Sequence, residues 1–212
     1  MQGLLLKDLY SLKKTMGILA VMLVAFGVVF IPQGGGLFAG MAILVGTTLT
    51  ISTMSYDHMA KWEIYALSMP ISRRQLVGEK YLFMLMTAGG GTAIALTGEF
   101  VRLAVIGSPA RAYFDGLLQT VLILAVGLLL GSLMLPLIFQ FGVEKARLVL
   151  LLSFCLPLVM VWGGGQLVQR SMYETQPASW LNQVIFLLPV AAIAALWISY
   201  LASVKIFEKK EF

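Results

Sequence analysis

Long apolar runs separated by short polar breaks dominate this chain of 212 residues. A helix that crosses a bilayer needs about 20 mostly apolar residues, so windows of that length are the informative signal. Six windows fit, at roughly 15–32, 37–56, 81–106, 116–140, 147–168 and 181–204. The pattern therefore predicts an all-α membrane protein with six transmembrane helices.

The composition strengthens this prediction. Hydrophobic residues make up 59% of the chain and charged residues 12%, whereas soluble domains carry about 25% charged residues. The six runs leave no stretch as long as the ~100 residues of a typical soluble domain. We therefore expect residues 1–212 to form a single transmembrane domain, and we expect its first apolar run, which is too long for a signal peptide, to be retained.

The basic residues are distributed unevenly between the two sides of the predicted bundle. Lysine and arginine near the ends of spans are retained on the cytoplasmic side. With the N-terminus inside, only Arg102, Arg111 and Arg170 of the 15 basic residues fall outside, which leaves 12 in cytoplasmic segments. Both termini are thus predicted to be cytoplasmic. The positive inner face could attract anionic lipid or a partner protein.

The segment before the first span has its own pattern. Leu5, Leu9, Leu12 and Met16 recur at helical spacing, while Lys7 falls off this stripe. Such an arrangement is typical of a helix that lies on the membrane surface. We expect an interfacial helix at the N-terminus.

A polar break at 57–80 interrupts the apolar pattern. Within it, apolar residues at helical spacing predict a short amphipathic helix: Met59, Trp62, Tyr65, Ala66 and Met69. Pro70 disfavours helix at the preceding residue, and Ser72 with Gln75 then matches the capping box S/T-x-x-E/Q that begins a new helix. The break is therefore predicted to be a surface helix set at a fixed angle to the third span. Such a helix can dock a partner or rest on lipid.

The same stretch resembles a known family. SYDHMAKWEIYALSMPISRRQLVGEKYL, at 55–82, is similar to the signature of small ABC-2-type permeases of bacterial ABC exporters, and the ends GLLLKDLYSLKK and KIFEKKEF also resemble that family. The matching positions are Asp57, Lys61, Trp62, Tyr65, Ala66, Leu67, Pro70, Ser72, Arg73, Lys80 and Tyr81. The resemblance implies a six-span permease of the bacterial plasma membrane that exports amphipathic peptides or hydrophobic antimicrobials.

The resemblance also implies partners. The permease would pair with itself or with a sister permease and would sit on two copies of an ATP-binding subunit, which binds ATP and magnesium. The loop between spans two and three would supply the coupling helix. The residues predicted to dock the ATPase are Asp57, Lys61, Trp62, Tyr65, Pro70, Arg73 and Arg74, with Glu144, Lys145 and Arg147 as a weaker second contact. The alternative is a membrane scaffold that binds a soluble partner through 57–80 and transports nothing.

Catalysis by this chain is not expected. The sequence has one histidine, His58, and one cysteine, Cys155, and it contains neither H-E-x-x-H nor the phosphate-binding G-x-x-x-x-G-K-[ST]. We therefore expect no enzyme activity, no metal or cofactor in this chain, and no nucleic-acid partner.

Polar residues inside the predicted spans are candidates for a substrate pathway: Thr48, Ser52, Glu99, Arg102 and Gln119. Serine and threonine also join helices through hydrogen bonds. Glu99 and Arg102 are spaced i, i+3, so they can form an ion pair on one helix face. A simple interfacial salt bridge is the alternative to a pathway role.

Two glycine triplets, 89–91 and 163–165, stand inside predicted spans. Each glycine costs a helix about 1 kcal/mol relative to alanine, so something must compensate. Close helix packing is the first interpretation, and a hinge or a substrate-facing groove is the second. Pro136, Pro157 and Pro189 predict kinks in the last three spans.

Overall fold

In a computed structural model, the chain forms a bundle of long helices, and the structure describes residues 2–32, 35–69, 72–142 and 179–209. The helices in these ranges are α1 (Gln2–Phe30), α2 (Gly35–Met59), α3 (Trp62–Leu67), α4 (Arg73–Ile106), α5 (Ala110–Phe141) and α7 (Ser179–Lys209). No strand occurs in these ranges. The all-α prediction is confirmed there.

Four of these helices are long and apolar enough to cross a bilayer: α2, α4, α5 and the Leu187–Lys209 part of α7. Helix α1 would be a fifth if its two parts count as one span, because Gly3–Lys13 and Thr15–Phe30 meet at an angle of 66°. The predicted span at 147–168 lies outside the described residues. The number six and the orientation in the membrane therefore stay predictions.

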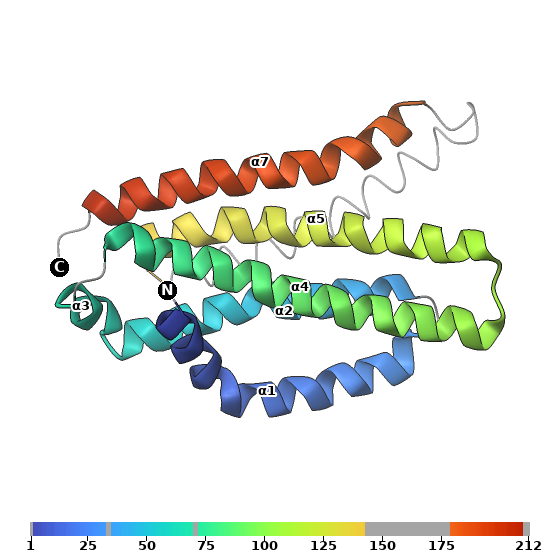
Figure 1. The fold of residues 1–212 in the computed structure, drawn as a ribbon, viewed down its shortest axis with the longest axis horizontal. Helices are drawn as coiled ribbons and strands as arrows, with labels where there is room; N and C mark the ends of the chain where they lie inside the picture. The colour runs from blue at the N-terminus through green and yellow to red at the C-terminus, as the bar shows by residue number, and fades with distance from the viewer. Residues whose placement is uncertain (1, 33–34, 70–71, 143–178, 210–212) are drawn as a thin grey trace.

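The helices pack around α4. The most extensive contacts join α2 to α4 and α5 to α7, and α5 also packs on both α2 and α4. Helix α1 touches α2 and α4 less and bows away from them along its middle (Figure 1). Gly46 and Gly91 permit the close approach of α2 and α4, since a Cβ at either position would stand 2.4 Å from a backbone oxygen of the facing helix. Close packing is thus confirmed for Gly91 in the first triplet.

The largest apolar core lies at the end of the bundle that carries α3, which we call the α3 end. Its buried members come from every described helix and include Leu4, Met54, Ala66, Met84 and Phe207. The opposite end, where α4 turns into α5, is called the Glu99 end. Pro136 and Pro189 lie inside continuous helices α5 and α7.

The N-terminal part of α1 packs on the protein through a face that differs from the predicted stripe. Leu4, Asp8 and Leu12 are buried, whereas Leu9 and Met16 are exposed. The buried residues follow the spacing i, i+4, i+8 and the predicted stripe follows i, i+4, i+7, i+11; both are helical and share Leu12, but the buried face includes a charged residue. An apolar stripe alone could not identify this face, because it includes Asp8, whose charge is compensated by the neighbouring Lys7 and by Lys80, far along the chain.

Candidate coupling site at the α3 end

Helix α2 ends and α3 begins at a single unusual backbone position. Lys61 has φ 50° and ψ 33°, the left-handed conformation that few residues other than glycine adopt. The backbone N–H of Ala60 still donates to Tyr56 O in the last turn of α2, and Lys61 N–H donates to His58 O. The chain therefore turns at Lys61, so the predicted helix from Met59 to Met69 is shortened to Trp62–Leu67.

The side chains of α3 divide between the core and the surface. Ala66 is fully buried, and Trp62 packs partly buried against the core. Tyr65 is 57% exposed and Met59, at the end of α2, is 81% exposed. The Trp62 and Tyr65 rings lie 5.4 Å apart. Trp62 thus anchors α3 to the bundle, while Tyr65 is available at the surface.

The capping box predicted before α4 is confirmed. Gln75 N–H donates to Ser72 Oγ at 3.3 Å, and Ser72 N–H donates to Gln75 Oε1 at 3.1 Å. Two backbone donors at the helix terminus are satisfied in this way. The start of α4 is therefore fixed at Arg73. Pro70 lies outside the described residues.

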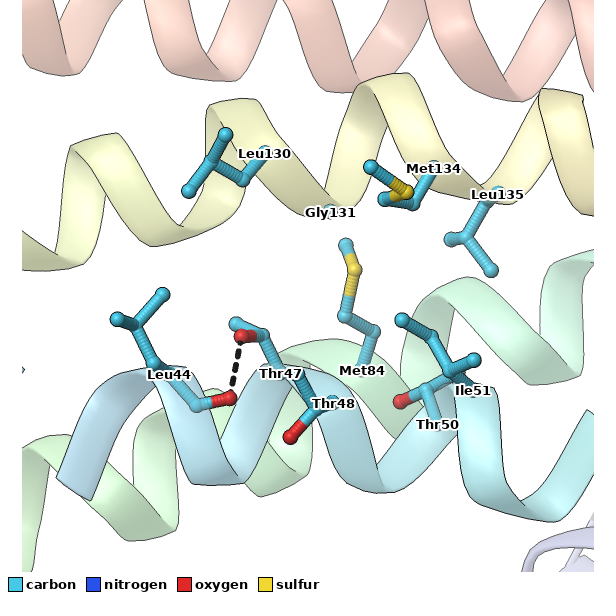
Figure 2. A pocket seen from close by; sticks show the side chains of 10 residues that line it. All are labelled: Leu44, Thr47, Thr48, Thr50, Ile51, Met84, Leu130, Gly131, Met134 and Leu135. Atoms are coloured by element: carbon cyan, nitrogen blue, oxygen red, sulfur yellow. Dashed lines mark hydrogen bonds between the residues drawn. The ribbon is translucent and has the colours of Figure 1, made fainter. Parts of the chain in front are cut away.

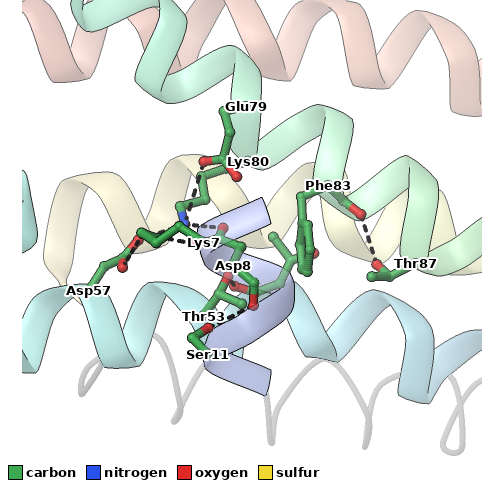
Figure 3. Close-up of polar contacts among 10 residues, drawn as sticks. Lys7, Asp8, Ser11, Thr53, Asp57, Glu79, Lys80, Phe83 and Thr87 are labelled. Carbon is green, nitrogen blue, oxygen red and sulfur yellow. Dashed lines mark hydrogen bonds and ion pairs between the residues drawn. The ribbon is translucent and has the colours of Figure 1, made fainter. Parts of the chain in front are cut away.

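A buried ionic cluster joins three helices beside α3 (Figure 3). Lys80 Nζ of α4 lies 2.5 Å from Asp8 Oδ2 of α1 and 2.6 Å from Asp57 Oδ2 of α2. Lys7 Nζ lies 2.5 Å from Asp57 Oδ1 and 2.9 Å from Asp8 Oδ1. Each aspartate is thus bridged by two lysines. Glu79 Oε2 is 3.5 Å from Lys80 Nζ and completes the cluster.

The cluster also reaches α3. Lys7 Nζ lies 4.7 Å from the centroid of the Trp62 ring, within the range of a cation–π interaction. A displacement of α3 would therefore disturb a lysine that is held by α1 and α2. Four helices, α1 to α4, are connected through these contacts.

Burial makes the electrostatics of this cluster strong. Asp8, Asp57, Glu79 and Lys80 are all buried, and two ammonium groups face three carboxyl groups. Asp8 precedes the first predicted span. Burial by itself would raise the pKa of its carboxyl, but the charge of Lys80 and the hydrogen bonds with Glu79, Lys80 and Lys7 outweigh burial and lower that pKa below its usual range. Asp8 therefore carries its negative charge at neutral pH, and the lysines are needed to balance it.

The two arginines predicted to dock the ATPase bind within the chain. Arg73 Nη1 donates to the backbone oxygens of Phe207, at 3.2 Å, and Glu208, at 2.8 Å. Arg74 Nε lies 2.9 Å from Glu208 Oε1 in an exposed ion pair. A cation at these carbonyls complements the C-terminal end of the α7 dipole. The α3 end of α7 is thus fastened to the start of α4.

A second polar network ties α7 to α4 and α5 just beyond the cluster. The Tyr81 hydroxyl forms hydrogen bonds with Ser199 Oγ at 2.6 Å and Ser203 Oγ at 2.8 Å. Ser199 Oγ also donates to Ser132 O of α5. These groups are buried, so each bond satisfies a polar atom that water cannot reach.

The predicted docking residues thus occupy different environments. Tyr65 and Lys61 are exposed, and Trp62 is partly buried. Asp57 is only 9% exposed and is enclosed by Lys7 and Lys80, so any part it has in docking would be indirect. The second predicted contact, Glu144, Lys145 and Arg147, lies outside the described residues.

The predicted pathway residues do not converge on one space. Thr48 and Ser52 donate to Val45 O and Thr48 O of their own helix. Thr48 lines a small cavity between α2, α4 and α5, about 20 Å³ in volume (Figure 2). This volume suits a single water molecule and is far too small for a peptide. Gln119 is exposed on α5.

The predicted pair at the other end is confirmed as an ion pair. Arg102 Nε and Nη2 lie 3.0 and 2.5 Å from the two carboxylate oxygens of Glu99. Glu99 is buried against Gly35, the first residue of α2, where a Cβ would collide with its carboxylate, and against Gly116 of α5, where a Cβ would stand a tight 3.1 Å from its Cγ. The carboxylate therefore also meets the positive end of the α2 dipole.

Across the described part of the chain, no group of three or more His, Cys, Asp or Glu side chains is placed to hold a metal ion. In the ionic cluster, the carboxylates of Asp8 and Asp57 form ion pairs with Lys7 and Lys80. The arrangement is suited to mechanical connection between helices.

The sequence predictions missed the ionic cluster. Its members stand far apart in the chain, at 7–8, 57 and 79–80. A signal was available, since Asp8, Asp57 and Lys80 all fall at the predicted cytoplasmic ends of segments that must meet in a bundle. Opposite charges at one level of neighbouring spans are expected to pair.

Comparison with known proteins gives one family. The family model described as "ABC-2 family transporter protein" matches residues 3–208. No curated protein and no solved structure matches the chain.

Proposed function

The chain belongs to the ABC-2 transporter family, and on that premise we propose that it is the permease subunit of an ATP-driven exporter. It is a multi-pass membrane protein, with several helices long enough to cross a bilayer. We place it in the bacterial plasma membrane with both termini in the cytoplasm, because the basic residues concentrate on that side.

The observation that carries this proposal is the placement of α3. The helix stands between α2 and α4, turns away from α2 at the left-handed Lys61, and connects through Trp62 to Lys7. Lys7 in turn belongs to a cluster that holds α1, α2 and α4. A force on α3 would therefore reach three helices of the bundle at once.

Tyr65 is the anchor that we assign to the partner. Buried aromatic residues dominate the energetics of protein interfaces, and Tyr65 is an aromatic side chain that this chain leaves more than half exposed. Lys61 stands exposed beside it. We propose that a cleft in the ATP-binding subunit takes up the Tyr65 ring, and that Trp62 carries the displacement inward.

The free energy for transport would come from ATP bound by the partner subunit. This sequence contains no G-x-x-x-x-G-K-[ST] motif, so ATP and magnesium would be bound by two copies of a separate subunit. Closure of those copies on ATP would shift the two α3 helices of a permease dimer and change the populations of its conformations. Amphipathic peptides or hydrophobic antimicrobials are the substrates that we propose.

A matched pair of substitutions tests this role. Tagged permease would be coexpressed with an ATP-binding subunit from the same genome and purified, with wild type, Tyr65→Glu and Tyr10→Glu compared. Tyr10 is an exposed tyrosine of α1 at the same end of the molecule, so it controls for a new surface charge. We expect Tyr65→Glu to lose the ATPase and Tyr10→Glu to retain it, with equal amounts of permease in the membrane.

Three results bear on the proposal. Retention of the ATPase by Tyr65→Glu would refute docking through α3. Loss by both variants would show a general effect of surface charge. A wild-type permease that binds no ATP-binding subunit, and whose expression confers no resistance to any tested peptide, would favour the non-transporting scaffold.

A further inference from the structure

A long apolar groove, which we call the α1 groove, lies between α1 and the α2–α4 pair. It consists of two adjoining cavities of about 390 Å³ and 730 Å³. Ala20, Leu23 and Ile94 line both cavities, so the two are continuous. The residues that line it on α1 belong to the stretch of this helix that bows away from α2 and α4 in Figure 1.

The floor of the groove contains a glycine that protein packing does not explain. At Gly46 and Gly91 the backbone of the facing helix, α4 or α2, takes the space that a side chain would need. A Cβ on Gly90, in contrast, would meet nothing within 4 Å. Gly90 lines the groove. Because a glycine inside a helix costs about 1 kcal/mol relative to alanine, the missing side chain leaves room for something outside this chain.

The surroundings of the groove indicate what enters it. Met86 and Ile94 line the groove and remain about half exposed, so the groove opens to the outside of the bundle. Its walls are largely apolar, and α2 and α4, which form its floor, are both long and apolar enough to cross a bilayer. Along α4 the larger cavity continues from Ile94 to Val101, and the 390 Å³ cavity that contains Gly90 runs from Phe83 to Ile94, about 16 Å at 1.5 Å per residue. One leaflet contributes about half of the ~30 Å hydrocarbon core, so an acyl chain fits this length.

The end of the groove near α3 is basic. Leu9 lines the groove there, and the exposed Lys13 stands four residues later in the same straight part of α1, before the 66° bend. Helical spacing places Lys13 close to this mouth. We propose that the α1 groove binds one acyl chain of an anionic phospholipid, with the headgroup phosphate near Lys13. The lipid would fill the space that separates α1 from α4.

Two neighbouring glycines provide a matched test. Gly89 and Gly90 are both exposed and both have open space at the Cβ position, but only Gly90 is among the residues lining the groove. Wild type, Gly90→Leu and Gly89→Leu would be reconstituted in nanodiscs of phosphatidylglycerol and phosphatidylcholine. Each lipid would carry a photoactivatable acyl chain in separate samples. Labelled peptides and retained lipid would be measured by mass spectrometry.

We expect phosphatidylglycerol to label α1 and α4 near Leu23 and Ile94. A leucine side chain at position 90 would displace about two buried methylenes, so Gly90→Leu should lower this labelling roughly tenfold, whereas Gly89→Leu should leave it unchanged. Lys13→Gln should lower the preference for phosphatidylglycerol over phosphatidylcholine about fivefold. The melting temperatures of the variants would show whether each is folded.

Other results would overturn the proposal. Equal labelling of wild type and a folded Gly90→Leu variant, spread over all exposed helices, would identify ordinary boundary lipid. Cross-links between two copies of the chain through α1, without lipid at Leu23 and Ile94, would show that a second copy occupies the groove. A wild type that labels equally with both lipids would refute the headgroup assignment to Lys13.

Discussion

The two ends of the bundle both carry buried charge, but they use it differently. At the α3 end, Lys80 and Lys7 bridge Asp8 and Asp57 across α1, α2 and α4. At the Glu99 end, the ion pair joins Glu99 and Arg102 on a single helix. The first arrangement holds three separate helices together, whereas the second neutralises a carboxylate that packs against glycines of its neighbours.

This difference shows where the helices are mechanically joined. An ion pair within one helix does not resist movement of that helix against the others. A cluster shared by three helices does, because any one helix that leaves it exposes an unbalanced charge in a buried site. We therefore expect movement of α3 to be transmitted at the α3 end, and helices to separate more readily at the Glu99 end.

The largest effect is expected from Lys80→Met. This change leaves Asp8 and Asp57 buried with one lysine fewer, and breaking a buried ion pair typically costs about 3–5 kcal/mol. The free energy of unfolding in detergent should fall by that amount. Adding Asp57→Asn should recover part of the loss, since it removes one of the unbalanced charges. A loss of unfolding free energy below about 1 kcal/mol would contradict this prediction, because the cluster would then contribute no more than an exposed surface ion pair.

Removal of the cation at the other end should cost less. Arg102→Met breaks the two bonds to Glu99, but that carboxylate remains beside the positive end of the α2 dipole. The expected loss is about 1.5 kcal/mol, the lower range for a hydrogen bond to a charged group. The same unfolding assay measures it. A loss equal to that of Lys80→Met would remove the contrast between the two ends.

Tyr81→Phe should have a smaller effect. It removes the hydroxyl that bonds Ser199 and Ser203, while Ser199 keeps its bond to Ser132 O. We expect a loss of about 1 kcal/mol. Ser203→Ala in the same background should cost little more, because its partner is already gone. Additive losses in this double-mutant cycle would contradict a shared network.

The smallest effect is expected from Arg74→Gln. The pair with Glu208 is exposed on both sides, and such pairs contribute little to stability. The melting temperature should not change measurably, in contrast to Arg73→Gln, which removes the donor to two carbonyls of α7. Equal losses for both arginines would show that the exposed ion pair also fastens α7.

Much of the bundle follows from the sequence. Apolar windows predict the spans within α2, α4, α5 and α7, and the capping box predicts the start of α4. These features depend on neighbouring residues, so a local pattern is sufficient. The i, i+3 pair of Glu99 and Arg102 is predictable for the same reason.

The functional end could be predicted only in part. The position of α3 can be predicted from the sequence of residues 57–80. The burial of Asp57 in an ionic cluster cannot, because it depends on Lys7 and Lys80, which stand 50 and 23 residues away. Likewise, nothing local distinguishes Gly90 from Gly91; only the approach of α2 does. Contacts of this kind depend on how the helices are arranged around one another, which spacing within one helix does not reveal.

Helix α4 is unbroken for 34 residues. At 1.5 Å per residue it is about 51 Å long, well beyond the ~30 Å hydrocarbon thickness. One end stands beside α3 and the other carries Arg102. If α4 pivots near Ser72, a tilt of about 5° would carry its far end sideways through roughly 4 Å. A small displacement at the α3 end would thus be amplified, by the length of α4 alone, at the Glu99 end.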